Sequence, residues 1–309
     1  MTLIPDLIAQ LTLHGLVAAL VVEGTLRWAS ITSPDRRFLY RASALAIPVI
    51  LAPVFALATF RRDAFFQDLS LFVSARWSAI PAGPMDARSA TMLLLAVVGV
   101  LLLGRDLIPA AGHLLRRRQG DAALPIPETV REDVAVVAGR MGVEAPAIHV
   151  RPDERHGLHC GATPAHIFVT TGTIATLSRD ELRVALAHEL AHLAHRDVTW
   201  GWVVFGLRVL QAANPVAQIT GRRAVEELEF HADDRAREAT GSSHPLARAL
   251  VKCARQRGDD FLGLAGRGRL HNLERRCHRL LSPARSGNGD TGGLAAVWLT
   301  LAVLLLFVQ

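Results

Sequence analysis

The stretch ALAHELAHLAHRD (residues 185–197) holds three histidines within eight positions, and a glutamate directly follows the first of them. His188 and His192 are one helical turn apart, so both imidazole rings leave the same helix face with Cβ atoms about 6 Å apart. Two imidazole nitrogens at that spacing can bind one zinc ion at about 2.0–2.1 Å. The alternative is a polar helix face of hydrogen-bonded histidines, but composition predicts an HExxH motif only about 0.02 times in such a chain.

Glu189 follows His188 and lies about 100° further round the helix, so it points beside the metal rather than at it. From there its carboxylate can take a proton from water and pass it to a leaving amine. The motif therefore predicts a zinc-dependent metalloendopeptidase that binds one Zn²⁺ ion, with Glu189 as the catalytic residue.

A third protein ligand is needed, because a catalytic zinc takes three and keeps one position open. His195 is seven residues from His188 and about 10 Å further along the helix axis, too far for comfortable sharing of one ion. The segment EELEFHADDRA (226–236) places Glu229 and Asp233 four residues apart on one helix face. One of them can bind the metal while the other accepts a hydrogen bond from a ligand histidine. The alternative is an acidic surface cluster.

The segments around the motif predict its structural setting. SRDE (178–181) has the pattern of a capping box and starts a helix that runs to about Arg196. AIHVRP (147–152) and HIFVTTG (166–172) alternate enough to form strands. The second strand is either the edge along which an extended substrate lies or an ordinary structural strand.

Long uncharged runs near both ends of the 309-residue chain predict membrane spans. The expected spans are residues 7–22, 42–60, 89–104 and 294–309. The second run has 19 residues without a charge, which is enough to cross a hydrocarbon core of about 30 Å. The fold class is thus a mainly α integral membrane protein, with about four transmembrane helices and an inserted α+β zincin-type (gluzincin) domain.

The predicted domains follow from these spans. They are residues 1–118 with three transmembrane helices, 119–290 with the peptidase, and 291–309 with the last helix. The 27–41 loop holds four arginines in 15 residues, whereas the 61–88 loop holds four in 28. Because loops denser in arginine stay in the cytoplasm, we expect a multi-pass protein of the cell membrane whose peptidase domain is cytoplasmic.

The charge and the cysteines exclude other classes. The formal net charge is +6, but Lys252 is the only lysine among the 34 basic residues. Such a bias fits genome composition better than nucleic acid binding, so no direct nucleic acid partner is expected. The three cysteines form no CxxC pair, which suits buried thiols in a reducing compartment.

The motifs together resemble the glutamate-liganded zinc peptidases of membranes. The resemblance rests on ELRVALAHELAHLAHRD (181–197), NP (214–215) and EFHAD (229–233). It implies that His188, His192 and Glu229 hold the zinc ion and that Asp233 orients a ligand.

Two branches of these peptidases are similar to the chain. The BlaR/MecR-type antirepressor peptidases have three spans, a cytoplasmic zinc domain and a fourth span, which matches the predicted architecture. The HtpX-like proteases are closer in EFHAD, but they need two spanning helices between the ligands. Only 36 residues separate His192 from Glu229, which leaves no room for such a pair.

The BlaR/MecR-type resemblance implies regulatory proteolysis in signal transduction, with a cytoplasmic protein such as a BlaI-type transcriptional repressor as substrate and the lipid bilayer as surroundings. That branch carries a C-terminal penicillin-sensor domain, whereas this chain stops at Gln309. Direct β-lactam sensing is therefore not expected. The alternatives are an HtpX-like quality-control protease and a non-enzymatic signalling scaffold with a structural metal site.

Overall fold

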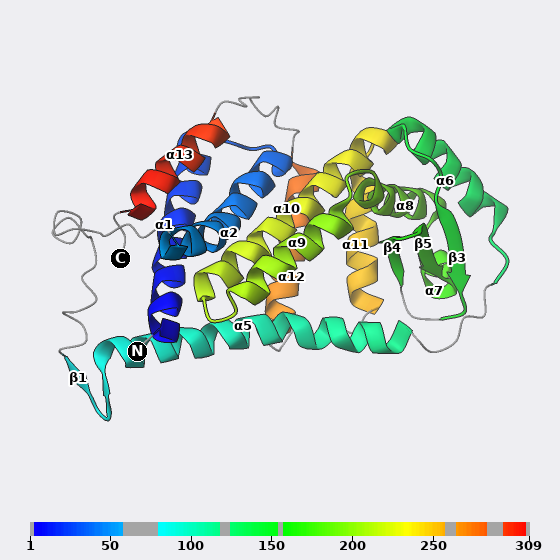
Figure 1. Ribbon diagram of the computed structural model, residues 1–309. Coiled ribbons are helices and arrows are strands. Elements are labelled where there is room, and N and C mark those ends of the chain that lie inside the picture. Colours follow the sequence, from blue (N-terminus) through cyan, green and yellow to red (C-terminus); the bar gives the residue numbers. More distant parts are fainter. Residues whose placement is uncertain are drawn as a thin grey trace. The chain divides into compact units, whose positions relative to one another are not determined.

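The computed structural model describes residues 3–57, 80–117, 124–153, 157–256, 264–282 and 293–306. Most of these residues are helical, and the chain divides into two compact units (Figure 1). Unit 1 comprises Met1–His113, Val203–Val225 and Ser286–Gln309, and unit 2 comprises Leu114–Trp202 and Glu226–Arg285. The predicted domain boundaries near residues 118 and 290 stay a prediction. The structure adds that Val203–Val225 lies in unit 1.

Four helices that lie wholly or mostly in unit 1 cover the described parts of the predicted apolar runs. They are α1 (Leu3–Trp28), α2 (Pro34–Leu57), α5 (Ala87–Arg117) and α13 (Gly293–Leu306). A two-residue hairpin of β1 (Pro81–Ala82) and β2 (Met85–Asp86) precedes α5. Residues 58–60 and 307–309 of the expected spans lie outside the described residues.

Among the described residues, one helix is long and apolar enough to cross a membrane. It is Ser89–Leu107 within α5, with 19 residues and a mean hydropathy of 2.0. Gly293–Leu305 in α13 is apolar but shorter. The structure thus contains one candidate span in its described part, and the number of four spans stays a prediction.

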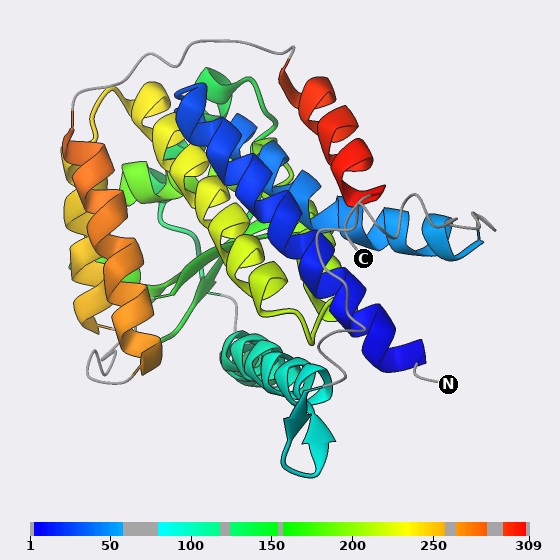
Figure 2. The same cartoon turned by 90° about the vertical axis from the view of Figure 1, so that its left-hand side faces the viewer.

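Buried residues of α1, α2 and α13 form the core of unit 1. On α1 and α13 they recur every four residues, which places them along one face of each helix. They are Ala18, Val22 and Leu26 of α1, Tyr40, Ala44 and Ile47 of α2, and Val297, Leu301 and Leu305 of α13. Figure 2 shows α1 in blue and α13 in red.

A helical hairpin of α9 (Asp197–Leu210) and α10 (Pro215–Thr240) occupies the segment between the predicted ligands. Asn214 begins α10, since its Oδ1 accepts from the backbone N–H groups of Val216 at 3.0 Å and Ala217 at 3.3 Å. A Cβ atom on Gly99 of α5 would lie 2.6 Å from the carbonyl oxygen of Ala212, so only glycine permits this approach.

The hairpin bears on the sequence argument about the 36 residues between His192 and Glu229. A helix pair does fit there, and its Val203–Val225 part joins the apolar helices of unit 1. Neither α9 nor α10 is long and apolar enough to cross a membrane by itself, so no spanning pair lies between the ligands. With 14 residues, α9 is about 21 Å long, which is less than a hydrocarbon core of about 30 Å.

Unit 2 is built on a three-stranded sheet with the order β3-β5-β4. Its strands are β3 (Ala147–Arg151), β4 (Leu158–Ala162) and β5 (Ala165–Thr170), with β5 parallel to β3 and antiparallel to β4. Both predicted strands exist. Of the two alternatives for HIFVTTG, the edge strand is wrong and the ordinary structural strand is confirmed, because β5 is central and β4 lies at the edge.

Helix α8 (Arg179–Ala194) carries the HExxH motif through the centre of unit 2. The predicted capping box is confirmed: Ser178 accepts from the backbone of Glu181, and the Glu181 side chain accepts from the backbone of Ser178. The helix packs against α6 (Glu128–Met141), α11 (His244–Gln256) and strand β4.

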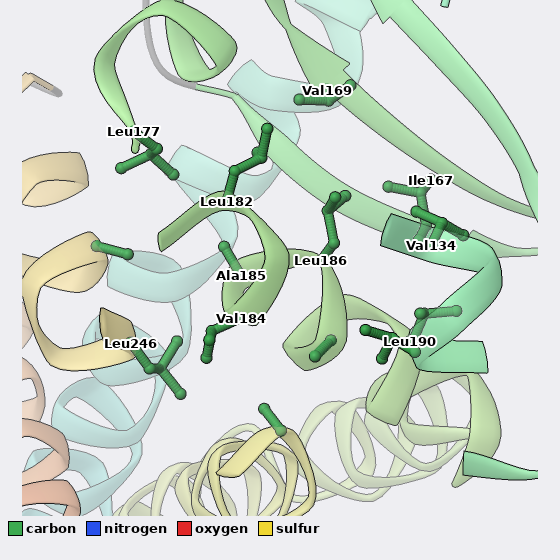
Figure 3. Packing of buried hydrophobic residues seen from close by; sticks show 14 of the residues in the cluster. Val134, Ile167, Val169, Leu177, Leu182, Val184, Ala185, Leu186, Leu190 and Leu246 are labelled. Atoms are coloured by element: carbon green, nitrogen blue, oxygen red, sulfur yellow. The ribbon is translucent and has the colours of Figure 1, made fainter. Parts of the chain in front are cut away.

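Apolar side chains on several sides of α8 explain its central position. Leu186 and Leu190 are fully buried and belong to the same core as Val134 of α6 and Ile167 of β5 (Figure 3). On another side of unit 2, α11 and α12 (Leu264–Leu281) run side by side (Figure 2). Helix α7 (Thr171–Thr176) connects β5 to the turn before α8.

Candidate metal centre

The two histidines of the motif point their Nε2 atoms at each other. One helical turn separates them on α8, and His188 Nε2 lies 3.1 Å from His192 Nε2. Their ring centroids are 4.6 Å apart. Neither ring is turned to solvent, since His188 is buried and His192 is half-buried.

Glu229 of α10 completes a group of three. Its Oε2 lies 3.6 Å from His188 Nε2, and its Oε1 lies 3.7 Å from His192 Nε2. Three atoms that each lie about 2.0–2.1 Å from a tetrahedral zinc ion are about 3.4 Å from one another. The spacing and the donor set of two imidazoles and one carboxylate therefore fit zinc. The structure brings the three predicted ligands together.

Each histidine has a carboxylate beside its other ring nitrogen. Asp233 Oδ1 lies 3.0 Å from His188 Nδ1, and Asp197 Oδ2 lies 2.7 Å from His192 Nδ1. The hydrogen bond to Asp197 fixes the tautomer of His192 in which Nε2 offers a lone pair to a metal. Asp233 contacts His188 Nδ1 as an ion-pair partner, but this contact lacks hydrogen-bond geometry. The structure places Asp233 where the sequence predicted a carboxylate that orients a ligand.

The sequence analysis did not identify Asp197 as part of the site. Its Oδ1 also lies 2.6 Å from His195 Nδ1, so one carboxylate serves two histidines. This explains the third histidine of the opening stretch, which lies outside the ligand group. The sequence feature that could have identified Asp197 is its position directly after His195 and Arg196, at the start of α9.

The sequence analysis also missed Arg276 of α12. Its guanidinium donates to Glu229 Oε2 at 2.7 Å and to both carboxylate oxygens of Asp233 at 2.7 and 2.9 Å. Its Nη2 further lies 3.3 Å from His188 Nε2. No local motif identifies this residue, because it belongs to an arginine-rich helix typical of many surfaces.

The site favours cations. Burial by itself lowers the pKa of His188, but the carboxylates of Asp233 and Glu229 outweigh it and raise this pKa to about 9. Burial raises the pKa of Glu229 and of Asp233, but Arg276 and the nearby histidines hold both below their ordinary values. Both carboxylates are thus ionised at neutral pH and available to a metal ion or its ligands.

Glu189 is half-buried on α8 and lies outside the group of ligand atoms. Its carboxylate neighbours the thiol of Cys160 on β4, and burial together with this carboxylate raises the pKa of the thiol. The edge strand β4 therefore runs past the predicted general base. Such a strand can pair with an extended peptide through its main chain.

Comparisons with known proteins agree with this geometry. A family model described as BlaR1 peptidase M56 matches residues 85–280. The protease HtpX homolog of Aeropyrum pernix is 28% identical over 167 residues, covering 42% of this chain and 52% of that protein. The protease HtpX homolog of Ralstonia pickettii is 32% identical over 132 residues, covering 41% and 46%. The chain spans about half the length of the curated relatives that it matches.

Proposed function

Because this chain belongs to the BlaR1 peptidase M56 family, we propose that it is a membrane zinc metalloendopeptidase. Its single zinc ion is held by His188, His192 and Glu229, and Glu189 is the catalytic base and acid. The observation that carries the proposal is the convergence of two Nε2 atoms and a carboxylate within 3.1–3.7 Å. The aspartates behind both imidazoles support it, since metal-binding histidines usually have such partners.

The residues divide the chemical work. A bound zinc ion supplies a Lewis acid that polarises the scissile carbonyl and lowers the pKa of water. Glu189 accepts the proton of the attacking water and returns it to the leaving amine. Asp197 holds the imidazole of His192 in the tautomer that binds metal, and Asp233 lies in ion-pair contact with the imidazole of His188.

The edge strand β4 gives the substrate a path. Among the described residues β4 pairs with β5 alone, so its other side can hydrogen-bond an extended peptide. The peptide would then pass Glu189, because Cys160 of β4 neighbours that carboxylate. An unfolded or extended protein segment is the substrate that this arrangement suits.

The comparisons support two alternative proposals for the substrate class. The family description names BlaR1, which favours regulatory cleavage of a cytoplasmic protein such as a BlaI-type repressor, with signal transduction as the role. The relatives named protease HtpX homolog favour quality control of damaged membrane proteins. In both cases the peptidase domain faces the cytoplasm and the other helices span the cell membrane.

The test is proteolysis by the full chain in detergent, with wild type, Glu189→Gln and Glu144→Gln compared. Loss of the base should lower kcat about 10²–10⁴-fold and leave the zinc content unchanged. Glu144 is exposed on unit 2, so its variant should match wild type. Equal proteolysis by the Glu189→Gln protein would contradict the role of Glu189, whereas metal binding without proteolysis by wild type would support a signalling scaffold with a structural metal instead.

Substrate choice is tested in the same assay. A purified winged-helix repressor and an unfolded membrane protein are offered in parallel. Metal-dependent cleavage of the repressor alone supports the regulatory role, and cleavage of the unfolded membrane protein alone supports the quality-control role.

A further inference from the structure

Arg276 connects two of the site's carboxylates with one planar group. Of its N–H groups, one reaches Glu229 and two reach Asp233, all at 2.7–2.9 Å. Its side chain is only 12% exposed, and that of Asp233 is 1% exposed. Charge-assisted bonds that are this short and this buried are among the stronger interactions in proteins.

The bond to Glu229 selects one carboxylate oxygen. The two oxygens lie at similar distances from the histidines, Oε2 at 3.6 Å from His188 Nε2 and Oε1 at 3.7 Å from His192 Nε2. They differ in that Arg276 Nη1 donates to Oε2 at 2.7 Å and not to Oε1. A carboxylate whose second oxygen is held by an arginine offers one oxygen to a metal rather than two. This matters because a tetrahedral zinc site takes one atom from each ligand.

The bonds to Asp233 act on His188. Arg276 holds both oxygens of Asp233, and one of them, Oδ1, lies 3.0 Å from His188 Nδ1. The arginine thereby fixes the carboxylate that lies in ion-pair contact with the imidazole. Arg276 thus influences two of the three predicted ligands, Glu229 directly and His188 through Asp233.

We propose that Arg276 is a positioning residue of the metal centre, which sets Glu229 as a one-oxygen ligand and locks Asp233 against His188. The inference rests on the proposed function. A lysine could not replace the arginine, because an ammonium lacks the fixed fork that reaches both carboxylates at once.

Arg276 could have two other effects, one that opposes metal binding and one that is purely structural. A positive charge beside the metal site lowers the affinity of the site for a metal cation by Coulomb repulsion. Removing Arg276 could therefore tighten metal binding. The arginine could also serve only to join α12 to α10, as its neighbours do. Arg275 pairs with Glu226 at 2.7 Å and Arg279 pairs with Asp234, both outside the ligand group.

Three variants of the full chain in detergent separate these effects: Arg276→Gln, Arg276→Lys and Arg275→Gln. Zinc affinity is measured by chelator competition, and the visible absorption of the Co²⁺-substituted protein reports the number of ligand atoms. Arg276→Gln and Arg276→Lys should bind zinc about 10–100-fold more weakly. Their Co²⁺ bands should weaken, because Glu229 is released to bind through both oxygens.

Arg275→Gln is the matched control, since it removes the same charge from the same helix and breaks an ion pair to the same partner helix. Its zinc affinity should stay within about fivefold of wild type, with an unchanged Co²⁺ spectrum. Wild-type affinity in Arg276→Lys, tighter binding by Arg276→Gln, or equal losses in all three variants would each overturn the inference.

The proposed function fails in a different way. A wild-type protein that binds no metal, or that cleaves equally well with Glu189→Gln, would end the proposed function. A wild type that passes both tests while the Arg276 variants keep its affinity and spectrum would refute the role of Arg276 alone.

Discussion

Each unit of the molecule contains a buried polar cluster, and the two clusters differ in their balance of donors and acceptors. In unit 1, Asp106 of α5 accepts from Arg208 Nη2 and from Arg222 Nε. Gln218 accepts from Arg208 Nε at 3.1 Å and donates to the Arg208 carbonyl oxygen at 2.9 Å. In this cluster the hydrogen-bond donors of the arginines and of Gln218 are paired with acceptors.

The cluster of unit 2 has the opposite character. His188 Nε2 and His192 Nε2 face each other at 3.1 Å, and a carboxylate lies within 3.7 Å of both. Within the described part of the chain, Arg276 is the one donor near these three atoms, so the acceptors outnumber the donors and the group suits a bound cation. The difference teaches that a metal site is recognised by an excess of converging lone pairs, and a structural network by their complete pairing.

The amides at the tip of the α9–α10 hairpin follow the structural pattern. Gln211 Nε2 donates to the carbonyl oxygen of Leu45 at 2.9 Å, and Asn214 Nδ2 donates to that of Leu11 at 3.1 Å. Both side chains are about 2% exposed. They attach the hairpin to α1 and α2 through backbone groups.

The largest expected effect that sharpens this comparison comes from Asp106→Ala. Arg208, whose side chain is 8% exposed, would be left in unit 1 without its carboxylate. The free energy of unfolding should fall by about 3 kcal/mol, measured by thermal unfolding in detergent, while the zinc content stays unchanged. The control is Glu128→Ala, which breaks an exposed pair with Arg131 and should cost less than about 0.5 kcal/mol. Loss of zinc from Asp106→Ala would contradict a purely structural role.

The next largest effect is a loss of stability on mutation of Glu181, an acid of unit 2 whose carboxylate is hydrogen-bonded by several donors. Glu181 accepts from Lys252 Nζ at 2.6 Å, from the backbone N–H of Ser178 at 2.9 Å and from Arg248 Nε at 3.1 Å. Burial raises the pKa of Glu181, but these partners outweigh it and lower the pKa from 4.5 to about 2. Because Arg248 and Lys252 are 60% and 41% exposed, solvent screens part of this contribution, and Glu181→Gln should cost about 1–2 kcal/mol at pH 7.

The sign of the pH dependence follows from the lowered pKa. The ionised carboxylate stabilises the fold fully above the unfolded pKa of 4.5, and this contribution is lost as the pH falls through about 2. Thermal unfolding of wild type and Glu181→Gln should thus converge in acid. A difference that persists at pH 2 would show that packing, rather than charge, accounts for the cost.

The smallest effect is expected for Cys160→Ala. The thiol neighbours Glu189 but lies outside the ligand group, so zinc content and affinity should stay within about threefold of wild type. Burial and the Glu189 carboxylate raise the pKa of Cys160, so the thiol should react slowly with maleimide at neutral pH. Mass spectrometry of labelled wild type checks this, and a loss of zinc in Cys160→Ala would place sulfur among the ligands.

The sequence predicted the local parts of the site and missed the distant ones. The spacing of His188 and His192 and the capping box at Ser178 are helix-turn geometry, which neighbouring residues determine. Glu229 and Asp233 could be chosen because they also lie one turn apart, with support from the resemblance. Arg276 gave no such signal, because nothing near it in the sequence indicates that α12 lies against α10.

Two further points show the same limit. The alternation in HIFVTTG predicted a strand correctly, but the position of β5 in the middle of the sheet depends on β3 and β4 together. The 36 residues between His192 and Glu229 are too few for a pair of spanning helices, but their length did not reveal that part of α9 and α10 groups with the apolar helices of unit 1. Periodicity reports which face of an element is apolar, and it does not report which elements become neighbours.

The sequence by itself determined that one helix offers two imidazoles and a carboxylate on adjacent faces, since a 3.6-residue repeat fixes those directions. Glu229 and Asp233 of α10 were also already candidates from the sequence. Only the tertiary structure decided that Asp197 of α9 and Arg276 of α12 reach that helix as well. The physical reason is that hydrogen bonds across tens of residues depend on how buried helices pack, and a linear pattern contains no record of that packing.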